Sequence, residues 1–101
     1  MSYYVIGGED MVLGFRYAGV PGKAVENAEE ASRALAEACA DESVRIVIIE
    51  DMVAESIHED VNRVRFQSAR PVVVEVPGME GPNPNRADLL KLIREAVGIK
   101  L

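Results

Sequence analysis

The sequence predicts an α/β fold: a flavodoxin-like, doubly wound sheet of four parallel strands in the order 2-1-3-4, flanked by helices, with a C-terminal helix after a Pro/Gly-rich loop. Short apolar runs alternate with amphipathic stretches, which is the pattern of parallel strands joined through helices. One apolar run is β-branched almost throughout, as a strand covered on both faces requires. The fixed handedness of the crossovers leaves few other strand orders. A length of 101 residues with 49% hydrophobic residues suits one folded domain.

The first strand is predicted over residues 3–6, which are aromatic and β-branched. It stops at Gly7 and Gly8, a pair that permits a tight turn. Two acids follow, at the positive end of a predicted helix whose apolar residues recur every three to four positions. This first helix is expected to end near Gly19.

The second strand is the weakest prediction. Residues 20–25 contain a proline and a glycine, so if they form a strand it lies at a sheet edge. Asn27 with Glu30 three residues later fits a variant of the capping box and predicts the start of the second helix. We interpret Cys39 as a small core residue of that helix rather than a reactive thiol. The predicted buried stripe of the helix is Ala24, Ala28, Ala31, Leu35 and Cys39.

Residues 44–49 are predicted to form the central strand, because the run is almost entirely β-branched. Ser56 and Glu59 match the S-x-x-E capping box, which predicts a helix beginning there. His58 falls outside the apolar stripe of this helix, and nothing in the sequence pairs with it, so we expect a solvated surface residue. The stripe comprises Ile57, Val61, Val64 and Ser68.

The fourth strand is predicted over residues 72–76, with Pro71 tolerated at its start. Three prolines and two glycines then exclude a regular element over residues 77–85, which we interpret as a semi-rigid hinge. Residues 86–101 are expected to form a final helix with a wide apolar stripe and a short apolar tail. The predicted organisation is therefore a globular domain over 1–76, the hinge, and the C-terminal helix.

Composition excludes several classes of protein. A net charge of −6 disfavours binding to nucleic acid. No apolar run approaches the ~18 residues that span a bilayer, so we expect no membrane insertion and a cytoplasmic location. The single cysteine and the single histidine are too few for a disulfide framework or a zinc site, and no metal or cofactor is expected.

Acidic residues follow the first and third predicted strands. Glu9 and Asp10 follow the first, and Glu50 and Asp51 follow the third, at the edge where such sheets bind ligands. If these four carboxylates converged they would suit Mg²⁺, as in the phosphoacceptor pocket of receiver domains. Receiver domains also have a hydroxyl residue after the fourth strand and a lysine after a fifth strand, and this sequence has neither. The simpler interpretation is that the acids cap helices and offset helix dipoles.

Other catalytic signatures are missing from the sequence. The glycine pair after the first strand matches neither phosphate-binding loop motif, and the acids beside it would repel phosphate. Cys39 lies on a predicted buried stripe, and Ser56 is assigned to a helix cap, so neither is a candidate nucleophile. The sequence therefore predicts a protein without a catalytic site.

Three segments together resemble one family, the F subunit of V-type and archaeal A-type rotary ATPases and ATP synthases. They are VIGGED-x5-GFRYAGV over residues 5–20, VVVEVPGMEGP over 72–82, and LIREAVGIKL over 92–101. Each is moderately specific, and they occur in the family's order over the whole chain. Two positions depart from the family pattern, Met11 in place of threonine and Tyr17 in place of leucine, and these could alter a contact surface.

The resemblance implies a non-catalytic part of the central rotor stalk. Such a protein binds the long coiled-coil shaft, the D subunit, turns inside a ring of A and B subunits, and helps to join the shaft to the membrane rotor through the C subunit. The complex couples ATP hydrolysis or synthesis to proton or sodium transport. The chain itself is expected to bind no nucleotide and to lie in the cytoplasm at the membrane periphery.

Two sets of residues are assigned roles on this basis. Arg16 is expected to face outward, toward an acid of the shaft or of its own second helix, and Phe15 to lie in the core. The apolar stripe of the last helix either docks on the shaft or covers the protein's own sheet, and the sequence leaves both options open. The partner-binding set is Arg16, Leu89, Ile93, Val97, Ile99 and Leu101, and the structural-motif set is Gly7, Gly8, Gly14, Phe15, Gly19, Pro77 and Gly78.

Overall fold

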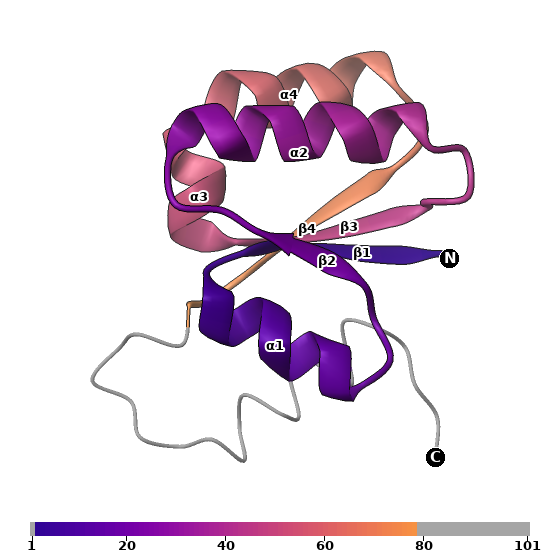
Figure 1. The fold of residues 1–101 in the computed structure, drawn as a ribbon. Coiled ribbons are helices and arrows are strands. Elements are labelled where there is room, and N and C mark those ends of the chain that lie inside the picture. Colours follow the sequence, from indigo (N-terminus) through magenta and orange to yellow (C-terminus); the bar gives the residue numbers. More distant parts are fainter. Residues whose placement is uncertain (1, 79–101) are drawn as a thin grey trace.

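The computed structural model describes residues 2–78, which form a parallel sheet between two layers of helices (Figure 1). Its strand order, within these residues, is β2-β1-β3-β4, and the predicted fold class is confirmed. Most of the predicted hinge and all of the predicted C-terminal helix lie outside the described residues. The strands are β1 (Tyr3–Gly7), β2 (Gly22–Ala24), β3 (Ile46–Glu50) and β4 (Val72–Val76). The helices are α1 (Glu9–Tyr17), α2 (Ala28–Ala40), α3 (Asp51–Ser56) and α4 (His58–Gln67).

The central strand β3 divides the hydrophobic interior into two cores. Val47 and Ile49 face the core formed with α2, α3 and α4, whereas Ile48 faces the core formed with α1. All three side chains are fully buried, as the β-branched run predicted. Phe15 is also fully buried and packs in the α1 core, in agreement with its predicted place.

The face covered by α1 is shielded mainly toward the carboxyl ends of the strands. Val76, at the carboxyl end of β4, is buried in the α1 core. Val72, at the other end of the same strand and on the same face, is 56% exposed. Within residues 2–78, α1 is the only helix in that core, where it packs against β1 and β2.

The edge strand β2 depends on one glycine. β2 pairs in parallel with β1, and the Val25 N–H donates to the Gly7 carbonyl oxygen at 2.9 Å. A β-carbon at Gly22 would stand 2.1 Å from Val5 Cγ1 and 2.4 Å from the Val5 carbonyl oxygen. Only glycine allows the two strands to approach this closely. The expected edge position is confirmed.

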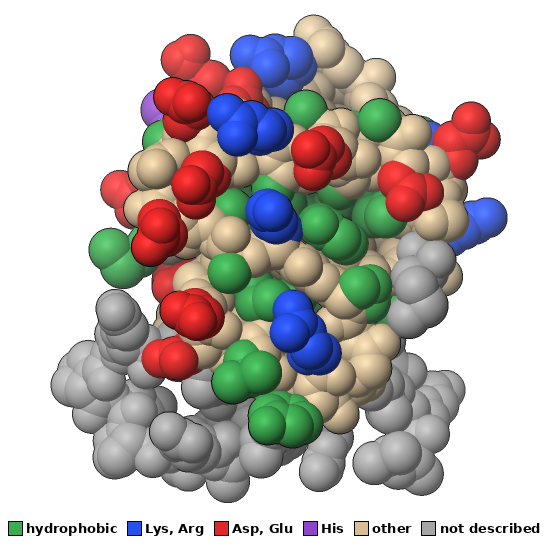
Figure 2. Space-filling view, viewed as in Figure 1, with side chains coloured by type: hydrophobic (Ala, Val, Ile, Leu, Met, Phe, Trp, Pro, Cys, Tyr) green, Lys and Arg blue, Asp and Glu red, His purple; other side chains and the backbone are tan. Residues whose placement is uncertain are grey.

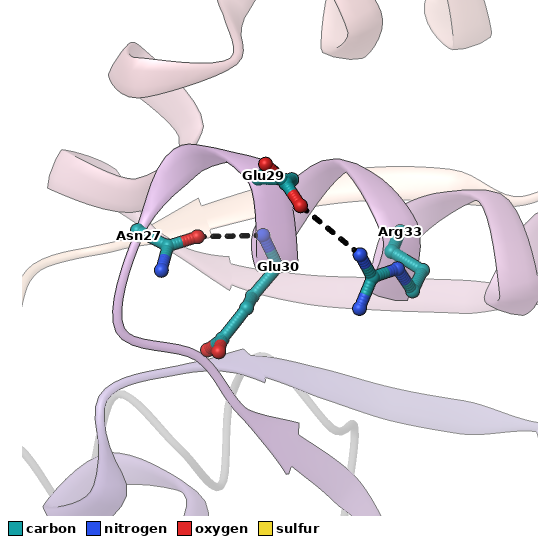
Figure 3. Close-up of polar contacts among 4 residues, drawn as sticks. All are labelled: Asn27, Glu29, Glu30 and Arg33. Atoms are coloured by element: carbon teal, nitrogen blue, oxygen red, sulfur yellow. Dashed lines mark hydrogen bonds and ion pairs between the residues drawn. The ribbon is translucent and has the colours of Figure 1, made fainter.

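The start of α2 is formed by the predicted cap (Figure 3). Asn27 Oδ1 accepts a hydrogen bond from the Glu30 N–H at 2.8 Å, and Glu30 Oε1 accepts one from the Glu26 N–H at 2.9 Å. An ion pair of 3.2 Å joins Arg33 to Glu29 one turn along the exposed side. The amides that a helix leaves unsatisfied at its start are thus partly satisfied by side chains.

The buried face of α2 differs from the predicted stripe. Ala24 and Ala28 are exposed, because one precedes the helix and the other begins it, and Cys39 is half-buried. In a helix of 3.6 residues per turn, each step of four residues rotates the side chain by about 40° around the helix axis. The predicted stripe contains several such steps, so it turns away from the side that faces the sheet. Burial raises the pKa of the Cys39 thiol, with Arg70 opposing, which fits a partly buried filler. The buried residues are Ala31, Ala34, Leu35 and Ala38.

The predicted capping box of the next helix is wrong. The chain enters α3 directly after β3, and Ser56 is the last residue of α3, where its Oγ donates to the Val53 carbonyl oxygen at 2.6 Å. Ile57 separates α3 from α4 with φ −128° and is buried in the core. The S-x-x-E pattern placed a helix start at Ser56. In the structure the buried Ile57 marks the boundary instead, with Ser56 ending α3 and His58 beginning α4. His58 is exposed, as expected.

Asp60 joins α4 to α2. Its carboxylate accepts hydrogen bonds from the Ser32 hydroxyl of α2 and from Arg63 Nη1, the latter at 2.9 Å. The Ser32 hydrogen bond has the largest effect and lowers the pKa of Asp60; partial burial opposes it, and the Arg63 guanidinium adds to the lowering, so the pKa lies below its ordinary value. The helices of this layer are therefore tied by a polar contact as well as by packing.

Replacing Gly22 with alanine is expected to destabilise the protein by about 1–3 kcal/mol or more, because the new methyl group overlaps Val5 and forces β2 away from β1. Lys23→Ala, on the exposed neighbouring residue, is the control and should change stability little. Urea unfolding of both variants measures the difference. Equal stabilities would show that the edge strand does not need this close approach.

Ser32→Ala is expected to destabilise the protein at pH 7 by less than about 1 kcal/mol, since the contact is partly exposed to water. The hydrogen bonds lower the folded-state pKa of Asp60, so their contribution is present above the ordinary aspartate value and is lost as the pH falls through the folded value. Urea unfolding at pH 7 and at a series of lower pH values should therefore show a difference that shrinks as the pH falls through the folded-state pKa of Asp60.

Ser56→Ala provides the control for this pH dependence, because the Ser56 hydroxyl donates to a carbonyl rather than to a carboxylate. Its effect on stability should not change over the same pH range. A Ser32→Ala effect that is equally independent of pH would contradict the assignment to Asp60.

Candidate functional site

Doubly wound sheets usually bind ligands beyond the carboxyl ends of the strands, where the winding reverses. That place lies here between β1 and β3, because α1 and α2 cover opposite faces of the sheet (Figure 1). Gly8 follows β1, and Glu50 ends β3. Glu50 Oε1 accepts a hydrogen bond from the Gly8 N–H at 2.8 Å. The protein's own carboxylate therefore occupies the switch point.

Three glycines make room for the Glu50 side chain. A β-carbon at Gly7 would lie 3.1 Å from Glu50 Oε1, and one at Gly8 would lie 3.4 Å from the same atom. At Gly78, after β4, a β-carbon would lie only 2.4 Å from Glu50 Oε2. One carboxylate thus lies against the chain that follows β1 and the chain that follows β4, so its contacts join the ends of three strands.

The same carboxylate completes the N-terminus of α1. Gly8 is the N-cap residue and has no side chain with which to cap the helix. Glu50 accepts the Gly8 N–H and places negative charge at the positive end of the helix dipole. Glu9 and Asp10 add two more acids to the first turn, and both are exposed. These contacts support the interpretation of the strand-end acids as helix caps.

The magnesium site considered from the sequence does not form. Among residues 2–78, no three His, Cys, Asp or Glu side chains lie close enough to hold a metal ion. Glu50 is directed to Gly8, and Asp51 Oδ1 accepts the Met52 N–H at 2.7 Å at the start of α3. The four acids are therefore divided between two helix N-termini, and the receiver-like prediction fails on its geometry.

Two surface hollows lie elsewhere on the described part of the molecule. A groove of about 510 Å³ runs between β2 and α2, and a hollow of about 320 Å³ lies beside α3 and α4. Both are open and lined mainly by polar and charged side chains, and neither includes Glu50 or the glycines around it. The groove is lined by Glu9, Lys23, Ala24, Val25, Glu26, Glu30, Arg33, Ala34 and Glu37.

The exposed side of α1 has the features of a contact surface. Arg16 is exposed, and its guanidinium forms no hydrogen bond or ion pair with another residue of the described range. Leu13 is 45% exposed and Tyr17 is 86% exposed, both unusual for large apolar side chains on one short helix. The expected tie between Arg16 and the second helix is not observed within residues 2–78, which leaves Arg16 available to a partner.

The remaining predicted residues are placed as follows. Gly19 has φ +85°, in the left-handed region that favours glycine, and it ends the turn after α1. Gly14 lies within α1 and is half-buried. Pro77 is exposed at the end of β4. The apolar residues assigned to the last helix and tail lie outside the described residues: Leu89, Ile93, Val97, Ile99 and Leu101.

The fold and the filled switch point define a class: a small doubly wound α/β domain whose usual ligand crevice is occupied by its own side chain. The profile of the ATP synthase (F/14-kDa) subunit matches residues 4–93. The chain belongs to this family of rotary ATPase subunits, and the resemblance seen in its three motifs is confirmed.

Individual relatives agree with the family assignment. The F subunit of the A-type ATP synthase from Methanococcus vannielii is 34% identical over 103 residues, covering 100% of this chain and 99% of the relative. That of Methanocaldococcus jannaschii is 31% identical over 102 residues, with the same coverage. The crystal structure of the F subunit of the V-type ATP synthase from Archaeoglobus fulgidus shares the fold, with a TM-score of 0.64 and 22% identity over 73% of this chain and 94% of that one.

Sequence reasoning missed two features of this region. It placed Glu50 among possible metal ligands, although the glycines at the ends of β1 and β4 were a signal that a bulky neighbour lies beside them. It named Tyr17 as a departure from the family pattern that could alter a contact surface, but it did not pair Tyr17 with Leu13. The spacing of Leu13 and Tyr17, one helical turn apart and opposite the buried Phe15, was the available signal.

Gly78→Ala is expected to destabilise the protein only while Glu50 is present. The added methyl group would displace Glu50 Oε2 and break the hydrogen bond to Gly8, at a cost of about 1–2 kcal/mol. In a Glu50→Ala background the same change should be nearly neutral, which gives a coupling energy of similar size. Guanidinium unfolding of the four proteins measures it.

Pro77→Ala is the control for this cycle, because the exposed Pro77 is next to Gly78 in sequence. Its effect should add to that of Glu50→Ala. Additive effects of Gly78→Ala and Glu50→Ala would show that the two residues do not meet as described.

Proposed function

We propose that this F subunit is part of the central rotor stalk of its complex, where it binds the coiled-coil shaft, the D subunit, and supports torque transfer. The observation that supports the proposal is the family match over residues 4–93, together with relatives named as the F subunit of A-type ATP synthases along the full chain. Torque transfer couples the hydrolysis or synthesis of ATP to the transport of protons or sodium ions.

The protein is proposed to have no catalytic site of its own. Three observations support this within residues 2–78: the usual ligand crevice holds Glu50, no cluster of metal-ligating side chains forms, and the one cysteine is half-buried with a raised pKa. Its contribution is mechanical instead. Close-packed cores on both faces of the sheet resist deformation, as an adaptor on a rotating shaft requires.

The contacts are proposed to come from two parts of the chain. Arg16 on α1 supplies a positive charge that has no ion-pair partner within residues 2–78, and the C-terminal residues Leu89, Ile93, Val97, Ile99 and Leu101 supply an apolar stripe. The main partner is the D subunit, and contacts to the C subunit and to the ring of A and B subunits follow from a place in the stalk. No helix within residues 2–78 is long and apolar enough to cross a membrane, and we place the protein at the membrane periphery in the cytoplasm.

Co-expression with the D subunit tests this function. The full chain is expected to co-purify with the shaft in a stoichiometric complex, and a chain truncated after Gly81 is expected to lose binding or coupling. Ile93→Ser with Val97→Ser in the full chain asks the same question without removing residues. A thermal melt of each variant alone checks that the domain still folds.

Two results would contradict parts of the proposal. If the full chain shows no affinity for the D subunit, its place on the shaft is wrong. If the truncated chain assembles and couples like the full chain, the last helix has no part in the mechanism, and shaft binding must depend on the globular domain alone.

A further inference from the structure

The outer surface of α1 combines features that no contact within residues 2–78 explains. We use the name α1 face for Leu13, Gly14, Arg16 and Tyr17. Leu13 and Tyr17 are one helical turn apart and together form an exposed apolar pair, with Arg16 beside them. In Figure 2 exposed hydrophobic side chains and a basic side chain lie over this helix, in the lower half of the view. Apolar pairs exposed next to a charge are typical of contact surfaces.

Gly14 adds an independent observation. Glycine weakens a helix relative to alanine, and three other glycines here are explained by crowding or backbone angle: Gly7, Gly19 and Gly22. Apart from the two adjacent residues and the backbone of α1 itself, no atom of a described residue lies within 4 Å of the place where a β-carbon of Gly14 would stand. The fold of residues 2–78 therefore does not require glycine there. A missing side chain on a partly exposed helix lets a second backbone approach closely.

We infer that the α1 face is the docking surface for an α-helix of the shaft, one that presents an apolar stripe to Leu13 and Tyr17 and a carboxylate to Arg16. The inference rests on the proposed function and names the part of the globular domain that would bind the shaft. Charge complementarity selects the carboxylate, because Arg16 has no acidic partner within residues 2–78. The open space beside Gly14 suits a helix, since packed helices lie only about 8–10 Å apart.

The other fully exposed aromatic residue provides a matched comparison. Phe66 on α4 is 86% exposed, the same as Tyr17, but it lies on the opposite side of the sheet (Figure 1). Its neighbours one turn earlier are polar, Asn62 and Arg63, and Arg63 is already paired with Asp60. Phe66 therefore lacks both an apolar neighbour on its helix and an unpaired charge, and it serves as the control.

The binding experiment compares full-length variants by calorimetry, with the purified D subunit as the ligand. Leu13→Ser with Tyr17→Ser is expected to weaken binding at least about tenfold, as truncation of central apolar contacts does. Arg16→Ala is expected to weaken binding by a smaller factor and to reduce its dependence on salt. Phe66→Ser should leave the affinity unchanged. The melting temperature of each variant alone is measured alongside.

Gly14→Ala separates docking from folding. Because no described atom obstructs the methyl group and alanine favours helix, the variant alone is expected to melt about 2–6 °C higher. If a shaft helix lies against this position, the same variant should bind the D subunit about tenfold more weakly or worse. A more stable protein that binds less well is an outcome that a purely structural role does not produce.

Four results would overturn the inference, and they can be told apart. If the wild-type protein binds the D subunit and the α1 variants bind it with the same affinity, the α1 face is not the docking surface, but the proposed function is unaffected. Failure of the wild type to bind the D subunit rejects the proposed function as well. If Gly14→Ala lowers the melting temperature, the α1 face is assigned to residues 79–101 of the same chain. The same assignment follows if the serine variants lower the melting temperature well beyond the change seen with Phe66→Ser. If the wild-type protein forms a dimer and the serine variants do not, the α1 face is assigned to contact with a second copy of the chain.

Discussion

Three segments that are far apart in the sequence meet at one carboxylate. Glu50 ends the central strand, accepts the amide of Gly8 at the start of α1, and lies against Gly78 where the chain leaves β4. The contact at Gly78 depends on glycine, because a β-carbon there would stand 2.4 Å from Glu50 Oε2. Since a partly buried charge is stable only when it is hydrogen-bonded, the turn after β1 and the exit from β4 must both keep their positions for Glu50 to remain where it is.

The position of α1 follows from this constraint. On the other face of the sheet, α2, α3 and α4 share one large core, and Asp60 also ties α4 to α2, so each helix supports the others. On its own face α1 is held at its N-terminus by Glu50 and along its length by Phe15 and its neighbours. The direction in which the exposed side of α1 points is therefore set by the Glu50 hydrogen bond at its N-terminus and by the packing of Met11, Val12 and Phe15 against the sheet.

The sequence was sufficient for the parts of the fold that depend on local patterns. The β-branched run at β3, the asparagine cap of α2 and the edge position of β2 were each predicted from a local pattern, and the structure confirms all three. The sequence pattern did not predict α3, and it assigned Ser56 as the start of a helix, whereas Ser56 ends α3 and α4 begins after Ile57, which is buried in the core. The contact of Glu50 with Gly8 joins residues 42 positions apart, and no spacing rule reports such a pair. Only the family resemblance indicated the function.

On the proposed function the domain is an adaptor on a shaft, and such an adaptor has a physical reason to fill its own switch point. In related folds that bind a ligand there, the strand ends are fully supported only when the ligand is present, and the added stability varies with its concentration. Glu50 is covalently part of the chain, so its occupancy of the switch point does not depend on a ligand concentration. The strand ends are therefore supported in every state of the complex. A receiver-like site would have made the stiffness of the domain depend on metal or phosphate. The replacement of a ligand by a glutamate is thus consistent with a component whose use is to remain rigid while its surroundings change.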